Sequence, residues 1–380
     1  MNIFLLIISL FFSLNLYGQV GPDGTGTVGG YYIGPGADLT GADLDGYGTY
    51  LESADLRNAN LTGASFRYTD LRDADLSGVI LNGADLTITN LRGADLSGAD
   101  LTGAILRHTN LEGAILDEVK SGNIDGTPTL PSGYQMVSGF IVGPNVNLTS
   151  ADLSGVDLSD TDLTGANLID ANLDGVTSGN IDGIPILPSD YQMINGFIVG
   201  PYVKISDADL SGVDLSGANL TGIMSWNIVG TPTLPSDYQM VKPYIVGPNV
   251  NLTNADFDGA DLSNTVLTGT DLSNANLTRA DLSNAELTSA NLLGANLDGV
   301  MSGNIIGTPT LPSGYQMVNG YIIGPKVNLS NADLTGADLS NADLSNANLS
   351  SVSLSSVNLS GADLNDANLS GADLRNADLS

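Results

Sequence analysis

Side chains with the chemistry for catalysis are few in this sequence. His108 is the sole histidine and follows Arg107, and the chain contains no cysteine. A Ser-His-Asp site needs a histidine that is oriented and partly buried, whereas the pattern around His108 predicts an outward position. The missing cysteine excludes disulfides and thiol chemistry. No phosphate-binding glycine loop, zinc spacing or EF-hand loop is present. We therefore expect no catalytic, cofactor-binding or metal-binding residues, and no enzyme.

The charge balance narrows the range of partners. The formal net charge is −31, from 42 acidic and 11 basic residues. Such a surface disfavours direct binding of nucleic acid and of anionic membranes. Regularly spaced Asp could hold Ca²⁺ weakly, and a solvated acidic face is the alternative. The abundance of Asp and Ser follows from a repeat in the sequence.

The repeat is clearest over residues 329–380. A small apolar residue stands two places before each Leu, and Asp, Asn or Ser lies between them. A period of five suits neither an α-helix nor a simple strand, so the repeat must be interpreted first. In this stretch Leu occupies positions 329, 334, 339, 344, 349, 354, 359, 364, 369, 374 and 379.

The polarity of the repeat predicts a coil. Leu and the residue two before it share one side of an extended step, and the other three residues face water. The frequent Gly or Asn suits a corner with positive φ. Four such sides make a square coil of about twenty residues, and coils would stack roughly 4.8 Å apart. Residues twenty apart should then form ladders, such as Asp338, Asn358 and Asp378.

The A-[DN]-L-[ST]-x pattern resembles the pentapeptide repeat family, and it covers well over half of the chain. The resemblance implies an all-β fold, a right-handed quadrilateral parallel β-helix. It implies little about function, because a fold does not determine an activity.

Arginines are concentrated early in the repeat. They follow the Leu or Phe centres, and Arg72 and Arg92 should lie on neighbouring coils. We interpret them as relief of acidic crowding, with a binding patch as the alternative. The arginines in question are Arg57, Arg67, Arg72, Arg92 and Arg107.

A second, longer repeat interrupts the pentads, and its copies begin near 121, 178, 225 and 302. Each copy contains Leu-Pro, Tyr-Gln-Met and Gly-Pro, which predicts two short strands. The sequence does not decide the type of turn between these strands, because Pro243 cannot adopt the positive φ of a type I′ turn. Residues 28–39 resemble the second half of a fifth copy. Trp226, the sole Trp, replaces a Gly of the other copies and suggests a packing variation.

These patterns predict the domain organisation. One coil cannot stand alone, so we expect one continuous solenoid with short β-rich flaps. Repeat blocks would span 51–120, 146–177, 203–224, 250–301 and 327–380, after an N-terminal segment at 19–50. Inserts would span 121–145, 178–202, 225–249 and 302–326.

Residues 1–18 carry no charged side chain and include a mostly apolar run. The run is too short for a transmembrane helix and is typical of a signal peptide, cut after Gly18. We therefore expect a secreted or periplasmic protein; a buried N-terminal strand or cap is the alternative.

The leading functional hypothesis is a non-enzymatic, acidic, secreted β-solenoid that acts as a scaffold or binds an unknown protein partner, with the inserts as contacts. The repeat runs to Ser380, and an open coil edge would favour end-to-end homodimers. The family implies an alternative, a DNA-mimicking inhibitor of a topoisomerase. Ice or mineral binding through Ser/Thr ranks is a third possibility.

Overall fold

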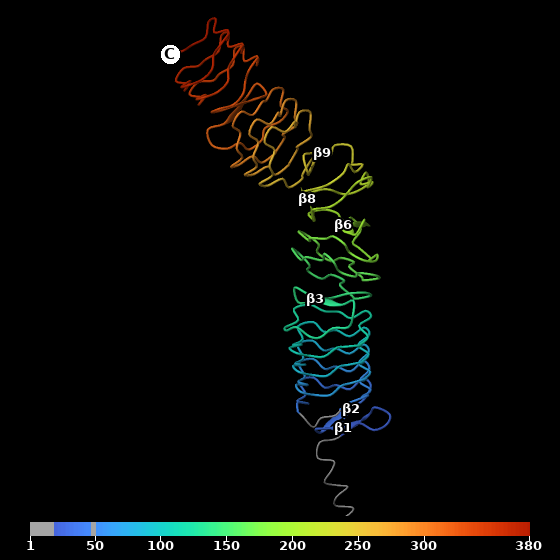
Figure 1. Ribbon diagram of the computed structural model, residues 1–380. Helices are drawn as coiled ribbons and strands as arrows, with labels where there is room; N and C mark the ends of the chain where they lie inside the picture. Colours follow the sequence, from blue (N-terminus) through green and yellow to red (C-terminus); the bar gives the residue numbers. More distant parts are fainter. Residues whose placement is uncertain (1–18, 47–50) are drawn as a thin grey trace, which may run out of the picture. The chain divides into compact units, whose positions relative to one another are not determined.

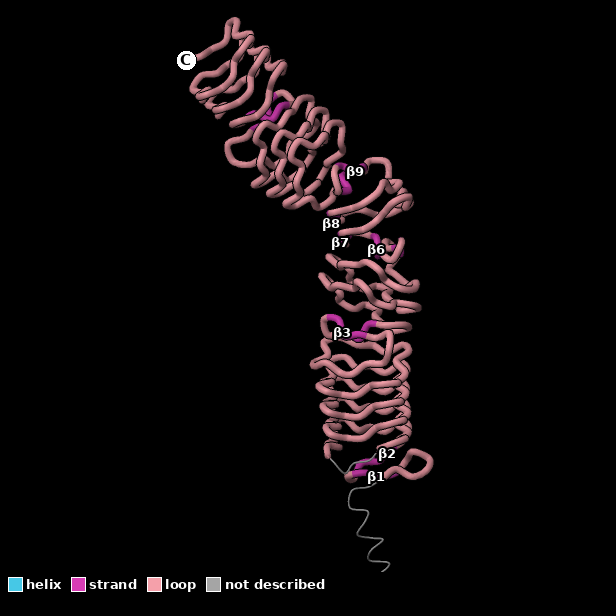
Figure 2. The backbone as a smooth tube through the Cα atoms, in the orientation of Figure 1, coloured by secondary structure: helices cyan, strands magenta, loops and turns pink. Residues whose placement is uncertain are grey.

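The computed structural model describes residues 19–46 and 51–380 and contains no helix in that part of the chain. The chain divides into two compact units, Met1–Ser189 and Asp190–Ser380, and each is described by itself. Most of the backbone is drawn as loop, because the coils are joined by single bridges rather than long strands (Figure 2). The strands are β1 Gly26–Val28, β2 Tyr31–Ile33, β3 Gln135–Val137, β4 Phe140–Val142, β5 Gln192–Ile194, β6 Phe197–Val199, β7 Lys204–Ser206, β8 Met224–Trp226, β9 Gln239–Val241, β10 Tyr244–Val246, β11 Gln316–Val318 and β12 Tyr321–Ile323.

In the first unit, parallel bridges join residues twenty apart, as the sequence predicts. Asp55 pairs with Asp75, and Asp75 pairs with Asp95. The Leu56 N–H donates to the carbonyl of Asp75 over 2.8 Å. Bridges recur at every fifth residue along a coil, so a coil has four pairing positions. The stacked coils are visible between β2 and β3 in Figure 1. The chain is therefore a β-solenoid built from pentads.

The core consists of the fifth-residue Leu and the small residue two before it. Leu56 and Ala54 are both fully buried, whereas Asp55 between them is partly exposed. Phe66, which replaces Leu once, is also fully buried. The inward assignment of the pentad centres is confirmed.

A left-handed residue follows most centres by two positions and makes the corner. Asn58 and Gly63 adopt φ values of 55° and 65° there. Gly reaches this region without a steric penalty, and Asn is tolerated. The corner position predicted from sequence is confirmed.

The five-residue period is broken once near the start of the repeat, and this changes the length of one coil. Leu51 follows Leu44 by seven residues instead of five, and part of that segment lies outside the described residues. Asp43 pairs with Ser65, 22 residues on, whereas the bridges of the next coils, such as Asp55 with Asp75, join residues twenty apart. The first coil is therefore two residues longer, and stacking continues beyond it.

The second unit forms the same coils. Asp338 pairs with Asn358, and Asn358 pairs with Asp378, as the predicted ladder requires. The Asn358 amide donates to the Asp338 carboxylate over 3.0 Å. Asn at alternate rungs therefore replaces a repulsion between stacked carboxylates with a hydrogen bond.

Each insert contains an antiparallel hairpin with a two-residue turn. In the first, Val137 pairs with Phe140, and Ser138 and Gly139 have φ of 48° and 85°, as a type I′ turn needs. The third insert has Lys242 at φ 53° followed by Pro243. Positive φ at the first position only is the pattern of a type II′ turn, so proline is accommodated. The other hairpins are β1–β2, β5–β6 and β11–β12.

The first insert is a widened coil rather than a flap that leaves the solenoid. Lys120 pairs with Asn147, so the chain returns to the same ladder after 27 residues. Asp125, inside the insert, pairs with Ile105 of the preceding coil. Ile141 of β4 is fully buried. This differs from the predicted excursion, because the hairpin is hydrogen-bonded to Ser121 and Ile124 of its own coil.

Two inserts of the second unit repeat this construction. Met224 pairs with Asn251 across the third insert, and Met301 pairs with Asn328 across the fourth. In the first, third and fourth inserts, a buried Ser stands at a pentad centre where the repeat has Leu. Its hydroxyl accepts an N–H of the hairpin twenty residues further along the chain. The pairs are Ser121 with Ile141 at 2.9 Å, Ser225 with Ile245 at 2.8 Å and Ser302 with Ile322 at 3.0 Å.

Candidate interaction surface

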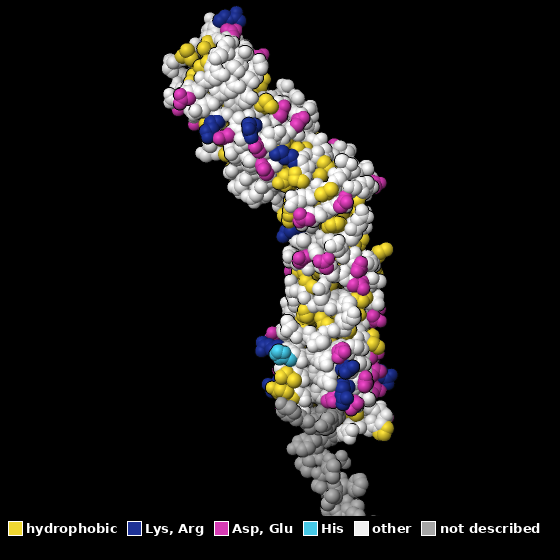
Figure 3. Space-filling model, viewed as in Figure 1, with side chains coloured by type: hydrophobic (Ala, Val, Ile, Leu, Met, Phe, Trp, Pro, Cys, Tyr) yellow, Lys and Arg dark blue, Asp and Glu magenta, His cyan; other side chains and the backbone are white. Residues whose placement is uncertain are grey.

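One corner of the first unit carries three large side chains at a position where Gly, Asn, Asp or Ser is common. Tyr68, Ile88 and His108 stand twenty residues apart, and all three are exposed. With Arg67 and Arg107 they form the group that we name the corner stripe. Tyr68 and Ile88 are 43% and 45% exposed, which is high for side chains of this size. In Figure 3 the histidine, in cyan, lies at the surface beside Lys or Arg side chains.

The backbone of the corner stripe is strained. Tyr68, Ile88 and His108 have φ of 60°, 59° and 58°. This region costs an L-residue roughly 1–2 kcal/mol, and a β-branched residue is a genuine outlier there. Such strain persists only where the surroundings enforce it.

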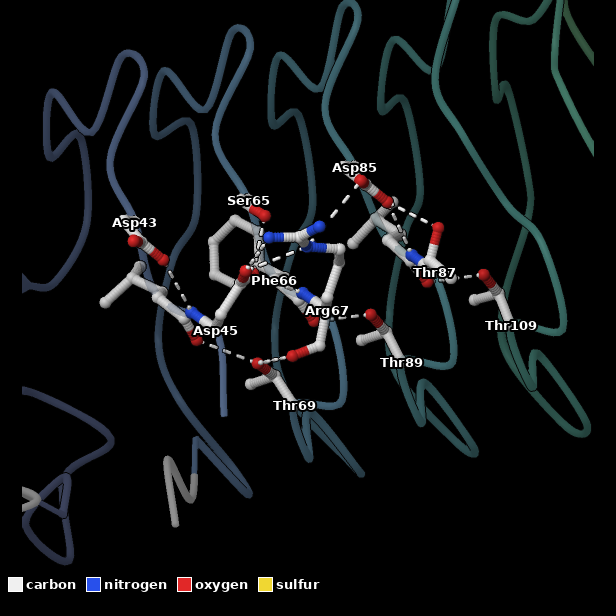
Figure 4. A network of polar contacts seen from close by, with 12 residues as sticks. Asp43, Asp45, Ser65, Phe66, Arg67, Thr69, Asp85, Thr87, Thr89 and Thr109 are labelled. Atoms are coloured by element: carbon white, nitrogen blue, oxygen red, sulfur yellow. Dashed lines mark hydrogen bonds and ion pairs between the residues drawn. The ribbon is translucent and has the colours of Figure 1, made fainter. Parts of the chain in front are cut away.

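A ladder of buried threonines adds hydrogen bonds beside these strained corners. Each Thr follows one stripe residue, and its hydroxyl donates to a carbonyl of the preceding coil (Figure 4). Because Thr stands where the repeat has Ala, the extra hydrogen bond ties each strained corner to the coil below. The bonds run from Thr69 to Leu44 at 2.9 Å, from Thr89 to Phe66 at 2.7 Å and from Thr109 to Leu86 at 2.7 Å.

Arginines flank the stripe and are held in place. Arg67 donates through Nε and Nη2 to the Asp45 carboxylate at 2.8 and 2.6 Å, as Figure 4 shows. Partial burial acts to raise the pKa of Asp45, but hydrogen bonds from Arg67 and Ser65 outweigh it and hold that pKa below its usual value. Arg107 pairs with Asp125 at 2.6 Å. The guanidinium groups are thus fixed beside the apolar side chains.

The geometry around His108 does not assemble a hydrolytic site. Within the described residues, its ring makes no hydrogen bond or ion pair, so nothing orients it as a general base. No group of three or more His, Asp or Glu side chains in residues 19–46 and 51–380 could hold a metal ion. The described residues also contain no helix with the length and hydrophobicity of a membrane span. What the stripe offers is a contact surface in which the apolar Tyr68 and Ile88 side chains lie beside two arginines.

Substitution of Ile88 by Gly should stabilise the protein by about 1 kcal/mol, because Gly adopts the left-handed corner without strain. Urea unfolding of the two proteins measures the difference. Ile80 is 42% exposed but is not among the positive-φ residues, so Ile80→Gly should destabilise instead. Equal effects of the two substitutions would show that the corner is not strained.

The repeats of the chain match a known family profile. The profile described as Pentapeptide repeats matches eight copies, which together cover more than half of the chain. The chain belongs to the pentapeptide repeat family. The matched segments are residues 47–83, 80–117, 145–177, 203–223, 249–284, 267–300, 328–366 and 342–380.

Solved pentapeptide repeat structures show similarity to this family member. HetL from the cyanobacterium Nostoc, involved in heterocyst differentiation regulation, is 24% identical, with 89% of each chain covered and a TM-score of 0.14. QnrB1, a plasmid-mediated fluoroquinolone resistance protein, is 14% identical, covering 83% of this chain and 91% of that one, with a TM-score of 0.14. At such TM-scores neither adds to the assignment, which depends on the repeat match. No curated protein sequence matches this chain.

The other arginines of this pentapeptide repeat protein are ion-paired. Arg72 lies 3.0 Å from Glu52 and 2.8 Å from Asp70, and Arg92 lies 3.9 Å from Glu112. This supports relief of acidic crowding over a separate binding patch at these positions. The sequence interpretation missed the corner stripe, although Tyr68 and Ile88 at a Gly or Asn position were a visible signal.

Proposed function

We propose that this pentapeptide repeat protein is a non-enzymatic scaffold that binds a protein partner through the corner stripe. The coil follows the right-handed, quadrilateral path of the family in this proposal. The observation that carries it is Ile88, an exposed β-branched side chain held in a left-handed corner. The left-handed corner costs the fold energy at a β-branched residue, whereas an exposed apolar group contributes to an interface.

The charge of the chain indicates the kind of partner. With a net charge of −31, the protein attracts surfaces with a basic rim. Within the stripe, the apolar surface of Tyr68 and Ile88 lies beside Arg67 and Arg107, each already paired with a carboxylate. A complementary partner would place an apolar strip against the stripe and basic residues around it.

A pull-down with the mature protein tests this proposal. Tyr68→Asn combined with Ile88→Gly installs residues that occupy equivalent corners elsewhere, such as Asn58 and Gly63, so the variant should fold. We expect it to lose a partner that the parent retains. Ile115→Asn, at another exposed Ile, is the matched control and should keep the partner. Equal capture by the double variant and the parent would refute the role of the stripe.

We propose further that the protein is exported. Support comes from the uncharged, mostly apolar residues 1–18, which lie outside the described residues. N-terminal sequencing of the protein from its expressing cells should begin at Gln19. A sequence starting at Met1 would overturn export and would leave the topoisomerase hypothesis, which the acidity motivates, to be tested by a gyrase inhibition assay.

A further inference from the structure

The third insert forms a groove that contains the sole Trp of the chain. It encloses about 420 Å³, within the range of roughly 300–1,000 Å³ for small-molecule sites. β8 and Tyr244 of β10 form one part of it, and residues of the next coil form the rest. We name it the Trp226 groove. The side chains that matter to the argument are Trp226, Tyr244, Asn251, Thr253 and Asn254.

The lining of the Trp226 groove is uncharged, although the chain is strongly acidic. None of its nine lining residues is Asp, Glu, Lys or Arg. The groove at the first insert is different: it encloses about 560 Å³ and is lined by Lys120 and Asp152, with Gly122 where the third insert has Trp226. The third insert therefore has an aromatic, neutral version of a groove that the insert creates.

Tyr244 is held rigidly on its side of the groove. Its ring lies 5.1 Å from the ring of buried Phe257, centroid to centroid. Its hydroxyl oxygen accepts the Asp256 N–H at 3.1 Å, which leaves the hydroxyl hydrogen to donate elsewhere. A fixed aromatic face of this kind loses little side-chain entropy on binding a ligand.

Trp226 and the polar residues have unused hydrogen-bonding capacity. In the described part of the chain, the half-buried Trp226 indole makes neither a ring contact nor a hydrogen bond. Asn251 accepts the Thr253 N–H through Oδ1 at 3.0 Å, so its Nδ2 can donate outward. The groove thus combines two aromatic rings with amide and hydroxyl groups and no ion.

We propose that the Trp226 groove binds a neutral oligosaccharide. The two aromatic rings can pack against the C–H face of a sugar ring, and the Asn251 amide and the Tyr244 hydroxyl can donate to its hydroxyls. Anionic sugars are disfavoured because no cation lines the groove and the surrounding chain is acidic. No carboxylate lines the groove, which disfavours a cationic ligand.

Because Trp226 is the sole Trp, its fluorescence reports directly on the groove. Cellohexaose, maltohexaose and chitohexaose are titrated separately into the mature protein. We expect a saturable change with at least one of them, with half-saturation below about 1 mM. The absence of saturation with all three at about 10 mM would overturn the proposal, as would equally tight binding of an acidic hexagalacturonate.

Calorimetry of variants then locates the site. Trp226→Gly installs the residue found at Gly122 and Gly303 of other inserts, so it should fold, and we expect at least tenfold weaker binding. Tyr321→Phe alters the equivalent aromatic of the fourth insert, outside the groove, and should bind as the parent does. Unchanged affinity in Trp226→Gly would overturn the assignment to this groove.

Discussion

Leu344→Asp should unfold the coils around residue 344 at denaturant concentrations that the parent withstands. Leu344 is fully buried between Leu339 and Leu349, which are also fully buried. An unpaired carboxylate in this apolar layer lacks both a charge partner and a hydrogen-bond donor. We expect a loss of more than about 4 kcal/mol, at the exceptional end for single substitutions. Urea unfolding followed by circular dichroism measures it.

Asp343→Asn is the matched control one residue away. Asp343 is partly exposed and accepts the Ser345 N–H at 3.0 Å, a bond that the Asn oxygen can keep. Hydrogen bonds from Ser345 lower the pKa of Asp343, so its charged form stabilises the fold above its usual pKa, and this is lost as the pH falls. Removing the charge also relieves repulsion from Asp363 on the next coil. We expect a change within about 0.5 kcal/mol; similar losses in both variants would contradict the inward position of Leu344.

Ile141→Asp should damage the protein more than removal of the whole first insert. Ile141 is fully buried, and its N–H donates to the buried Ser121 hydroxyl at 2.9 Å. The substitution leaves an unpaired charge in contact with the coil, which should cost several kcal/mol. A flap that left the solenoid would tolerate this change, so thermal unfolding of Ile141→Asp discriminates between the two descriptions.

Deletion of residues 120–146 removes one complete widened coil. Lys120 pairs with Asp100 below it and with Asn147 above it, so after the deletion Asn147 can take the place of Lys120. The buried hairpin is removed together with Ser121, to which it is hydrogen-bonded, and the coil of residues 147–167 can stack on the preceding coil in its place. Since coil stability is approximately a sum over neighbours, we expect a folded protein with an unchanged β spectrum. Aggregation of the deletion variant would show that the insert closes a separate small solenoid.

The sequence alone determined the coil. A strict five-residue period with Leu and Ala two apart can bury both only if the chain turns after each step, and the bridges between residues twenty apart confirm this. The ladder from Asp338 to Asp378 followed from the same arithmetic. These features are predictable because each coil makes the same contacts as the next. The local sequence pattern therefore also specifies the packing between residues that are distant in the chain.

The inserts were only half predictable. Their strands followed from Gln-Met and β-branched residues, but the turn containing Pro243 was left open and forms with Lys242 at positive φ. The burial of Ile141 against Ser121 was missed. It depends on a contact between an irregular hairpin and the coil below, which no periodicity encodes.

Only the tertiary structure decided the surfaces proposed for function. The spacing of Tyr68, Ile88 and His108 is readable in the sequence, but their exposure and the hydrogen bonds from the following threonines to the preceding coil appear only in the structure. Trp226 could be predicted only as a packing variant of Gly, whereas in the structure it lines a groove with Tyr244. The pentad repeat determines the path of the backbone. The surroundings of a residue that departs from the repeat consist of residues about twenty positions away. The stacking of coils, rather than the order of the chain, brings these residues together.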